Sequence, residues 1–117
     1  MQQNIIERTV YTRQILHILD RGMIVALSGQ RRVGKSCVMR GILNIMSQNY
    51  ANSIIYIDKE NVRYDAIRTY TELYAYVKEN IVPEKENYLF IDEVQEIKEF
   101  EKAVLSLHNE GVCRIIV

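Results

Sequence analysis

The sequence has little of what marks specialised classes of protein: it contains no tryptophan, one proline, two cysteines and no excess of either charge. Its 15 Lys and Arg residues balance 15 Asp and Glu residues, so the formal net charge is zero. That balance removes the general basic field with which many proteins attract nucleic acids or anionic membranes. Apolar runs are far shorter than a membrane span, and the charged residues among 1–20 are unlike a signal peptide. We therefore expect a cytoplasmic protein without a membrane segment, and nothing indicates nucleic acid as a partner.

The scarcity of cysteine and histidine argues against a metal centre built from these residues. Cys37 and Cys113 lie far apart without metal-ligand spacing, and reduced thiols in a cytosolic protein are the simplest interpretation. We predict that both are small buried hydrophobic residues, although Cys37 also lies near a helix start, where a thiolate would be favoured. His17 and His108 have no partners at ligand spacing, so we interpret both as structural or surface residues.

Two kinds of hydrophobic spacing alternate along the chain. Apolar residues at helical spacing predict four helices, and the third is expected to begin with Asp65 as its cap. Short continuous apolar runs predict strands buried on both faces. The helices are predicted over residues 8–20, 35–49, 65–81 and 100–111, with Gly22 and Gly111 ending the first and the last, and the strands over 23–27, 53–58, 88–91 and from residue 113 onward. Most tyrosines follow the helical spacing, which favours a core role over base stacking, notably for Tyr64, Tyr70, Tyr74 and Tyr76.

Strands that alternate with helices predict an α/β fold, in which a parallel sheet is covered by helices on both faces and the crossovers are right-handed. No repeat, linker or low-complexity segment divides residues 1–117, so we expect one domain. The run from Arg114 to Val117 has the composition of a buried strand that has just begun. We therefore expect the chain to be the N-terminal fragment of a longer protein.

The first chemical motif is the run Gly29-Gln30-Arg31-Arg32-Val33-Gly34-Lys35-Ser36, which matches the phosphate-binding pattern G-x-x-x-x-G-K-[ST]. The glycines permit a tight backbone that turns N–H groups inward around a β-phosphate. Lys35 should reach the β- and γ-phosphates, and the Ser36 hydroxyl should be a Mg²⁺ ligand. The helix that follows, with Cys37 near its start, points its positive end at the same phosphates. The sequence thus predicts that residues 29–37 bind ATP with Mg²⁺.

The second motif is the apolar strand Tyr88-Leu89-Phe90-Ile91, which ends in Asp92-Glu93. Ligands of parallel sheets lie at the carboxyl ends of the strands, where a carboxylate can hold Mg²⁺ through water. That role suits Asp92, and Glu93 is then placed to polarise the attacking water as general base. Acids at strand ends also cap following helices, but the preceding phosphate loop favours the catalytic interpretation. No Asn-Lys-x-Asp motif for reading guanine is present, which favours ATP over GTP.

With both motifs in place, the chain resembles the AAA-like branch of P-loop ATPases, and more narrowly a bacterial and archaeal family of ATP-binding proteins. The resemblance rests on residues 29–36, on Tyr56-Ile57-Asp58 and on the run from Tyr88 to Gln95. It implies a three-layer P-loop fold whose four predicted strands are ordered 1-4-3-2. It also implies a sensor, a fifth strand beside the first and a C-terminal domain, for which this sequence has no matching positions. The sheet edge left open in this way predicts self-association or marginal stability, so a homo-oligomer is one expectation.

Two functions fit these motifs, and a third fits them less well. The first is an ATPase in which Glu93 and Lys35 are catalytic and hydrolysis acts on a protein partner or an absent domain. The second is a nucleotide-binding regulatory module that does not hydrolyse its ligand. The third, a small-molecule kinase, would need an arginine-bearing lid, and no suitable insertion is present.

A few polar residues near the motifs have two interpretations. Gln95 could contact the nucleotide's water, but a solvated position at a helix start is the alternative. Arg31 and Arg32 could touch phosphate or a partner subunit, or simply be solvated. Asp58 and Glu60 could face the γ-phosphate side, whereas a role in the turn after the second strand is the alternative.

Overall fold

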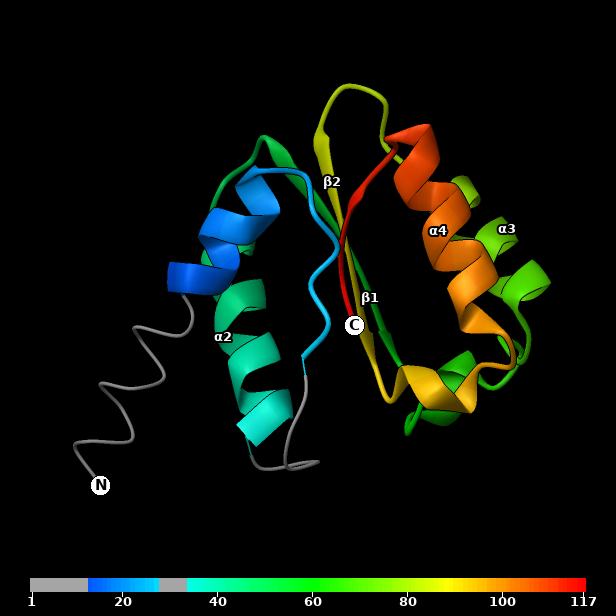
Figure 1. The fold of residues 1–117 in the computed structure, drawn as a ribbon. Helices are drawn as coiled ribbons and strands as arrows, with labels where there is room; N and C mark the ends of the chain where they lie inside the picture. The colour runs from blue at the N-terminus through cyan, green and yellow to red at the C-terminus, as the bar shows by residue number, and fades with distance from the viewer. Residues whose placement is uncertain (1–12, 28–33) are drawn as a thin grey trace.

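Figure 1 shows the computed structural model of the chain, which describes residues 13–27 and 34–117, the side chains of residues 34–36 excepted. After a helix over residues 13–20, the main elements are α2 (Gly34–Ser47), β1 (Asn52–Asp58), α3 (Tyr70–Asn80), β2 (Glu86–Asp92), α4 (Phe100–Glu110) and β3 (Arg114–Ile116). Short 3-10 turns at Val62–Tyr64 and Val94–Glu96 follow β1 and β2. Helices and strands alternate as predicted, which confirms the α/β class.

The three named strands form a parallel sheet in the order β1-β2-β3. β1 pairs with β2 along its whole length, and the pairing ends with Asp58 opposite Asp92. On the other side of β3, Val25 forms an isolated parallel bridge with Ile116. The predicted strand over residues 23–27 is therefore present in the structure as a short segment paired with β3.

Helices cover both faces of the sheet, with α3 and α4 on one face and α2 with the helix over residues 13–20 on the other (Figure 1). Side chains alternate between the two faces along a strand. Leu89 and Ile91 of β2 therefore enter the core beneath α3 and α4, whereas Tyr88 and Phe90 enter the core beneath α2. Burial on both faces explains why the sequence of β2 is a continuous apolar run.

Two of the predicted helix ends depend on glycine. Gly22 has φ 77° just after the helix over residues 13–20, and Gly111 has φ 68° just after α4. The N–H of Gly111 donates to the carbonyl oxygen of His108 at 3.0 Å, which closes the last turn of α4. Because side chains disfavour this left-handed conformation, glycine is the residue that ends the helix most easily.

The predicted start of the third helix is wrong. Asp65 follows the 3-10 turn, and α3 begins at Tyr70, after Thr69. The carboxylate of Glu72 accepts the N–H groups of Arg68 at 2.8 Å and of Thr69 at 3.0 Å. The run Thr69-Tyr70-Thr71-Glu72 is the T-x-x-E pattern of a capping box, which satisfies N–H groups that a cap at Asp65 would leave open.

The predictions for cysteine, histidine and tyrosine have mixed outcomes. Cys113 is buried as predicted, but Cys37 is exposed, because it lies on the part of α2 that faces away from the sheet. His17 is exposed and His108 is half-buried. The core role of the tyrosines is confirmed in part: Tyr64, Tyr70, Tyr74 and Tyr76 are partly buried and pack against the cluster beneath α3 and α4, whereas Tyr50 is exposed.

Candidate functional site

Asp92 is the last residue of β2, the middle one of the three named strands, and its exposure is only 4%. It continues the alternation of Tyr88 and Phe90, so it lies on the face of the sheet that α2 covers. The first turn of α2 lies at the same edge of the sheet (Figure 1). A buried carboxylate at this edge supplies the oxygen ligands that Mg²⁺ takes in proteins.

Asp58 lies next to Asp92, because the two residues are opposite each other at the carboxyl ends of β1 and β2. Its Oδ1 accepts the N–H of Glu60 at 3.0 Å, and its carbonyl oxygen accepts the N–H of Asn61 at 2.9 Å. The structure therefore gives Asp58 the turn role that was the simpler of its two interpretations. The chain continues the pairing one residue further, since the N–H of Lys59 donates to the carbonyl oxygen of Asp92 at 3.2 Å.

Glu93 is buried, with an exposure of 7%, and its backbone is left-handed at φ 59° and ψ 47°. Residues with a side chain rarely adopt this conformation, and such residues concentrate at functional sites. The Nε2 of Gln95 donates a hydrogen bond to the Oε1 of Glu93. Gln95 is itself exposed, so part of its expected solvation is confirmed, but its amide is engaged by a neighbouring side chain.

The pKa of Tyr56 responds to the charged groups at this edge of the sheet. Burial raises the pKa of the Tyr56 hydroxyl, and the negative charges of Asp58 and Asp92 raise it further. Arg40 of α2 acts in the opposite direction. Carboxylates from the ends of both strands thus act on one hydroxyl group, and a guanidinium group opposes them. Sequence analysis named Tyr56 only within the resemblance and did not find Arg40, whose position becomes informative only once α2 is packed on the sheet.

The residues of the predicted phosphate loop are described only in part. Gly29, Gln30, Arg31, Arg32 and Val33 lie outside the described residues, as do the side chains of Lys35 and Ser36. The backbone of Gly34–Ser36, the last three residues of the motif, forms the first turn of α2. Cys37 follows in the same helix. In the described part of the chain, no group of three or more His, Cys, Asp and Glu residues is placed to hold a metal ion.

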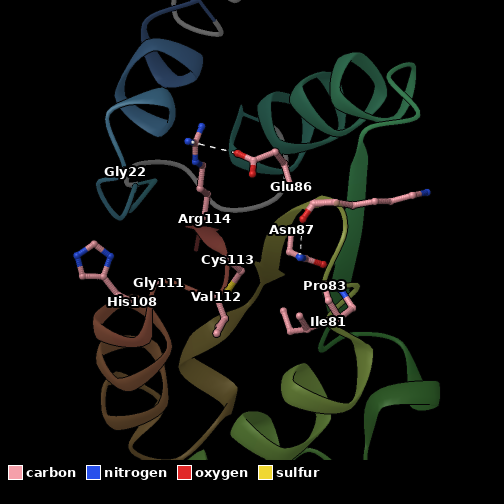
Figure 2. Close-up of a pocket in the computed structure, with 11 residues that line it drawn as sticks. Gly22, Ile81, Pro83, Glu86, Asn87, His108, Gly111, Val112, Cys113 and Arg114 are labelled. Atoms are coloured by element: carbon pink, nitrogen blue, oxygen red, sulfur yellow. Dashed lines mark hydrogen bonds and ion pairs between the residues drawn. The ribbon is translucent and has the colours of Figure 1, made fainter.

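A separate cavity of about 470 Å³ lies at the opposite edge of the sheet (Figure 2). Its lining comes from the amino ends of β2 and β3 and from the ends of α3 and α4, and includes Pro83, Asn87, His108, Cys113 and Arg114. Burial raises the pKa of the Cys113 thiol to about 11, which keeps this sulfur protonated and unreactive. No predicted site residue lies here.

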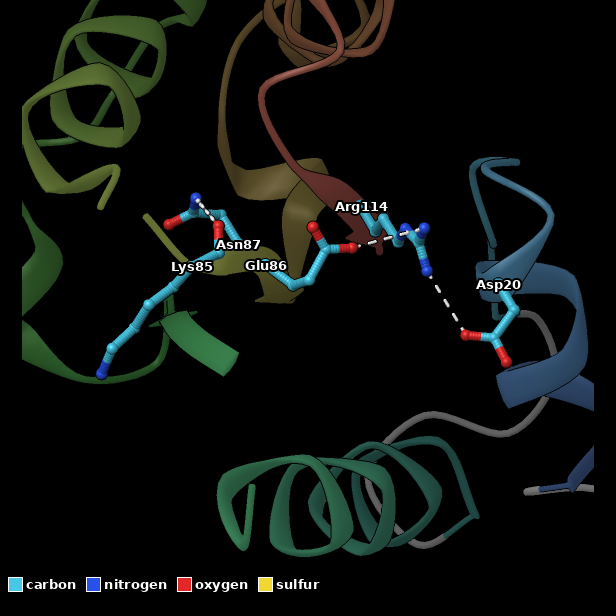
Figure 3. Close-up of polar contacts among 5 residues, drawn as sticks. All are labelled: Asp20, Lys85, Glu86, Asn87 and Arg114. Carbon is cyan, nitrogen blue, oxygen red and sulfur yellow. Dashed lines mark hydrogen bonds and ion pairs between the residues drawn. The ribbon is translucent and has the colours of Figure 1, made fainter. Parts of the chain in front are cut away.

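Polar groups beside this cavity are paired with one another (Figure 3). The guanidinium of Arg114 lies 3.3 Å from the carboxylate of Asp20 and 3.5 Å from that of Glu86. The side chain of Asn87 donates to the carbonyl oxygens of Val82 and Lys85 at 2.9 and 3.0 Å, and its Oδ1 accepts the N–H of Val82 at 2.9 Å. Sequence analysis missed these residues, and the only signal for them was a polar Asn next to an apolar strand.

Comparison with known proteins gives one family. Residues 21–117 match the model of a family described as an AAA domain. The chain is also similar to an uncharacterized protein of Haemophilus influenzae, with 26% identity over 120 residues. That alignment covers the whole of this chain but 30% of the relative, so the chain spans less than a third of that protein's length. No solved structure matches the chain. In the described part of the chain, no helix is both long enough and apolar enough to cross a membrane.

Proposed function

The chain belongs to the AAA domain family, and from this premise we propose that it binds ATP with Mg²⁺ and hydrolyses the nucleotide. The observation that carries the proposal is the pair Asp92 and Glu93, which are buried at the carboxyl end of β2. The carboxyl end of β2 lies at the edge of the sheet where α2 begins (Figure 1). A carboxylate pair in this position, after a G-x-x-x-x-G-K-[ST] motif, supports hydrolysis in addition to binding.

Residues 29–37 are the proposed phosphate site. The backbone N–H groups of Gly29 to Gly34 would surround the β-phosphate, and the N-terminal end of α2 would favour the same negative charge. Lys35 would donate to the β- and γ-phosphates. Ser36 would supply its hydroxyl oxygen to Mg²⁺, whose charge offsets that of the phosphates when it is bound.

The two carboxylates have different proposed roles. Asp92 would hold Mg²⁺ from the side opposite the loop, through water, which fits an oxygen ligand at the end of a buried strand. Glu93 would orient the attacking water and accept its proton as the water oxygen bonds to the γ-phosphorus, while the bond from this phosphorus to the β,γ-bridging oxygen breaks and ADP leaves. Asp58, which lies opposite Asp92, would add a further negative charge that favours a cation at this edge.

The complete sheet is proposed to have the order 1-4-3-2, where strand 1 is the segment over residues 23–27. The N–H of Val25 donates to Ile115 at 2.9 Å and that of Leu27 to Val117 at 2.7 Å, which supports this segment as the neighbour of β3. In the same segment, the N–H groups of the residues that alternate with Val25 and Leu27 then point away from β3. That open edge suits a further strand from a longer chain or a second copy of this one.

We also propose that hydrolysis acts on a protein partner or on a further domain. The relative in Haemophilus influenzae is more than three times as long as the aligned segment, which supports the presence of additional domains in proteins of this kind. A cytoplasmic location is the corresponding expectation for an ATP-dependent domain of balanced charge.

Single-turnover hydrolysis of Mg²⁺-ATP by the wild type and by Glu93→Gln tests the enzymatic part. We expect the variant to retain nucleotide binding and to lose hydrolysis by roughly 10²–10⁴-fold, the usual contribution of a general base. Glu96→Gln is the matched control, because Glu96 is an exposed glutamate on the adjacent 3-10 turn. Tight binding without turnover in the wild type would instead support a regulatory nucleotide-binding module.

Thermal unfolding with and without Mg²⁺-ATP tests the phosphate loop. A ligand that binds only the folded state raises Tm, and the rise grows with the logarithm of the ratio of ligand concentration to Kd. We expect Lys35→Ala to lose most of this rise, since the ammonium group would no longer pair with the phosphates. An unchanged rise in that variant would contradict the assignment of the loop.

A further inference from the structure

Glu93 and Glu99 are the residues other than glycine with positive φ in the described part of the chain, at 59° and 55°. They lie at the two ends of a short segment that joins β2 to α4. Glutamate has no local advantage in this conformation, so the surrounding structure must hold both residues there. Glu93, the proposed general base, therefore has a backbone conformation that contacts with neighbouring residues must maintain.

The side chain of Gln95 supplies one such contact, since its Nε2 donates to the Oε1 of Glu93. A carboxylate has two oxygens, and this donor occupies one of them. We propose that Gln95 is a positioning residue: it fixes the orientation of the Glu93 carboxylate and leaves the Oε2 atom to accept from the attacking water. This inference rests on the proposed function, because it gives Gln95 its role through Glu93.

The backbone that carries Gln95 is itself fixed on both sides. The N–H of Glu96 donates to the carbonyl oxygen of Glu93 at 3.1 Å, and the N–H of Ile97 donates to that of Val94 at 2.9 Å. Val94 and Ile97 are both buried in the core beneath α3 and α4. Because two core side chains anchor this turn, the main chain of Gln95 has little freedom to move. The side-chain amide of Gln95 therefore stays beside the Glu93 carboxylate.

Next along the chain, Lys98 ties the segment to α3. The N–H of Lys98 donates to the carbonyl oxygen of Arg68 at 2.8 Å, and its own carbonyl oxygen accepts the N–H of Tyr70 at 3.0 Å. Thr69 and Lys98 form an isolated parallel bridge. The turn that presents Gln95 is thus braced against the first residues of α3 as well as against the core, which is the arrangement required of a residue that positions another.

The kinetic test compares Gln95→Met with Glu96→Met, in the chain as printed. Methionine keeps the length and approximate volume of glutamine but has no N–H donor, so the first variant removes the contact and leaves the shape. We expect Gln95→Met to lower the single-turnover rate on the order of 10-fold with nucleotide affinity within about twofold of wild type, because misorientation affects the chemical step. Glu96→Met, with the same replacement one residue along, should leave both quantities unchanged.

A second measurement needs no nucleotide. Gln95→Met should lower Tm in the wild-type background, since the buried carboxylate of Glu93 loses its donor, and should lower it far less in a Glu93→Ala background. Gln95→His and Gln95→Asn keep an N–H donor. A higher Tm in these variants than in Gln95→Met would show that the donor is the relevant group.

The outcomes distinguish the positioning role of Gln95 from the proposed function of the domain. If wild-type hydrolysis is lost in Glu93→Gln but unchanged or faster in Gln95→Met, the positioning role is wrong and the proposed function stands. If the wild type binds ATP without turnover, the positioning role is overturned together with the hydrolytic part of the proposed function. Equal losses of Tm from Gln95→Met in both backgrounds would contradict the contact itself.

Discussion

Two opposite ends of the sheet differ in how their polar groups are paired. We call the carboxyl ends of β1 and β2 the carboxyl edge, and the amino ends of β2 and β3 the amino edge. At the amino edge, Arg114 faces two carboxylates and the amide of Asn87 makes three hydrogen bonds to the main chain. At the carboxyl edge, Asp58, Asp92 and Glu93 bring negative charges together, and Glu93 has a left-handed backbone. The first arrangement is expected to stabilise the fold, whereas the second reduces stability at the place where the nucleotide is proposed to bind.

The largest effect on stability is expected at the amino edge, from Asn87→Ala. Asn87 is 7% exposed, and its removal leaves the N–H of Val82 and two carbonyl oxygens without their partner. We expect the free energy of unfolding to fall by about 2–3 kcal/mol, measured by urea denaturation, with ATP affinity of the folded protein unchanged. Asn109→Ala, at an exposed position of α4, is the control and should change stability by less than about 0.5 kcal/mol. A loss of ATP affinity in Asn87→Ala would show that the two edges are coupled.

The positions of the strands and helices that form these two edges could largely be predicted from the sequence. Continuous apolar runs indicated strands buried on both faces, and the structure places β1 and β2 where those runs occur. The acids Asp92 and Glu93 were found because they directly follow such a run. Gly22 and Gly111 were found as helix ends because glycine alone takes positive φ without cost.

Other features could not be predicted because they depend on contacts between distant residues. Nothing local in the sequence indicates that Glu93 and Glu99 have positive φ, since glutamate is not selected by that conformation. Arg114 meets Asp20 only after the helix over residues 13–20 is packed beside β3. The start of α3 is a different case, because the sequence contains both the T-x-x-E pattern of Thr69 to Glu72 and a competing capping residue, Asp65.

A smaller effect, of opposite sign, is expected from Glu99→Gly. Glu99 has φ 55°, and glycine adopts this conformation without the penalty of a side chain. We expect the free energy of unfolding to rise by about 0.5–1 kcal/mol, after allowance for the greater freedom of glycine in the unfolded chain. Glu99→Gln separates the causes, because it removes the exposed 3.0 Å ion pair with Lys102 but keeps a side chain at the same backbone position. A gain in Glu99→Gln equal to that in Glu99→Gly would assign the effect to charge and not to backbone strain.

Arg114→Met tests how much the ion pairs of the amino edge contribute. Its contacts to Asp20 and Glu86 are 3.3 and 3.5 Å long and involve side chains that are 71% and 61% exposed, so solvent screens them strongly. We expect a loss of about 0.5 kcal/mol at low ionic strength, which decreases as salt is added. Arg21→Met is the control for removing a positive charge at this edge, because Arg21 is exposed. A loss that is large and independent of salt would mean that the aliphatic part of Arg114, and not its charge, holds the edge together.

The smallest effect is expected from Glu72→Gln, and it appears as a dependence on pH. The N–H of Arg68, followed by that of Thr69, holds the pKa of the Glu72 carboxyl below its ordinary value of 4.5. Because the folded pKa is the lower one, the carboxylate stabilises the fold fully above about pH 4.5, and this contribution is lost as the pH falls through the folded pKa. The difference in Tm between wild type and Glu72→Gln should therefore be greatest near neutral pH and should disappear in acid. Glu79→Gln, at an exposed position of the same helix, should show no such difference, because Glu79 does not cap the helix. A difference for Glu72→Gln that persists in acid would mean that the shape of the side chain stabilises the start of α3, and this part of the carboxyl edge would then not depend on charge.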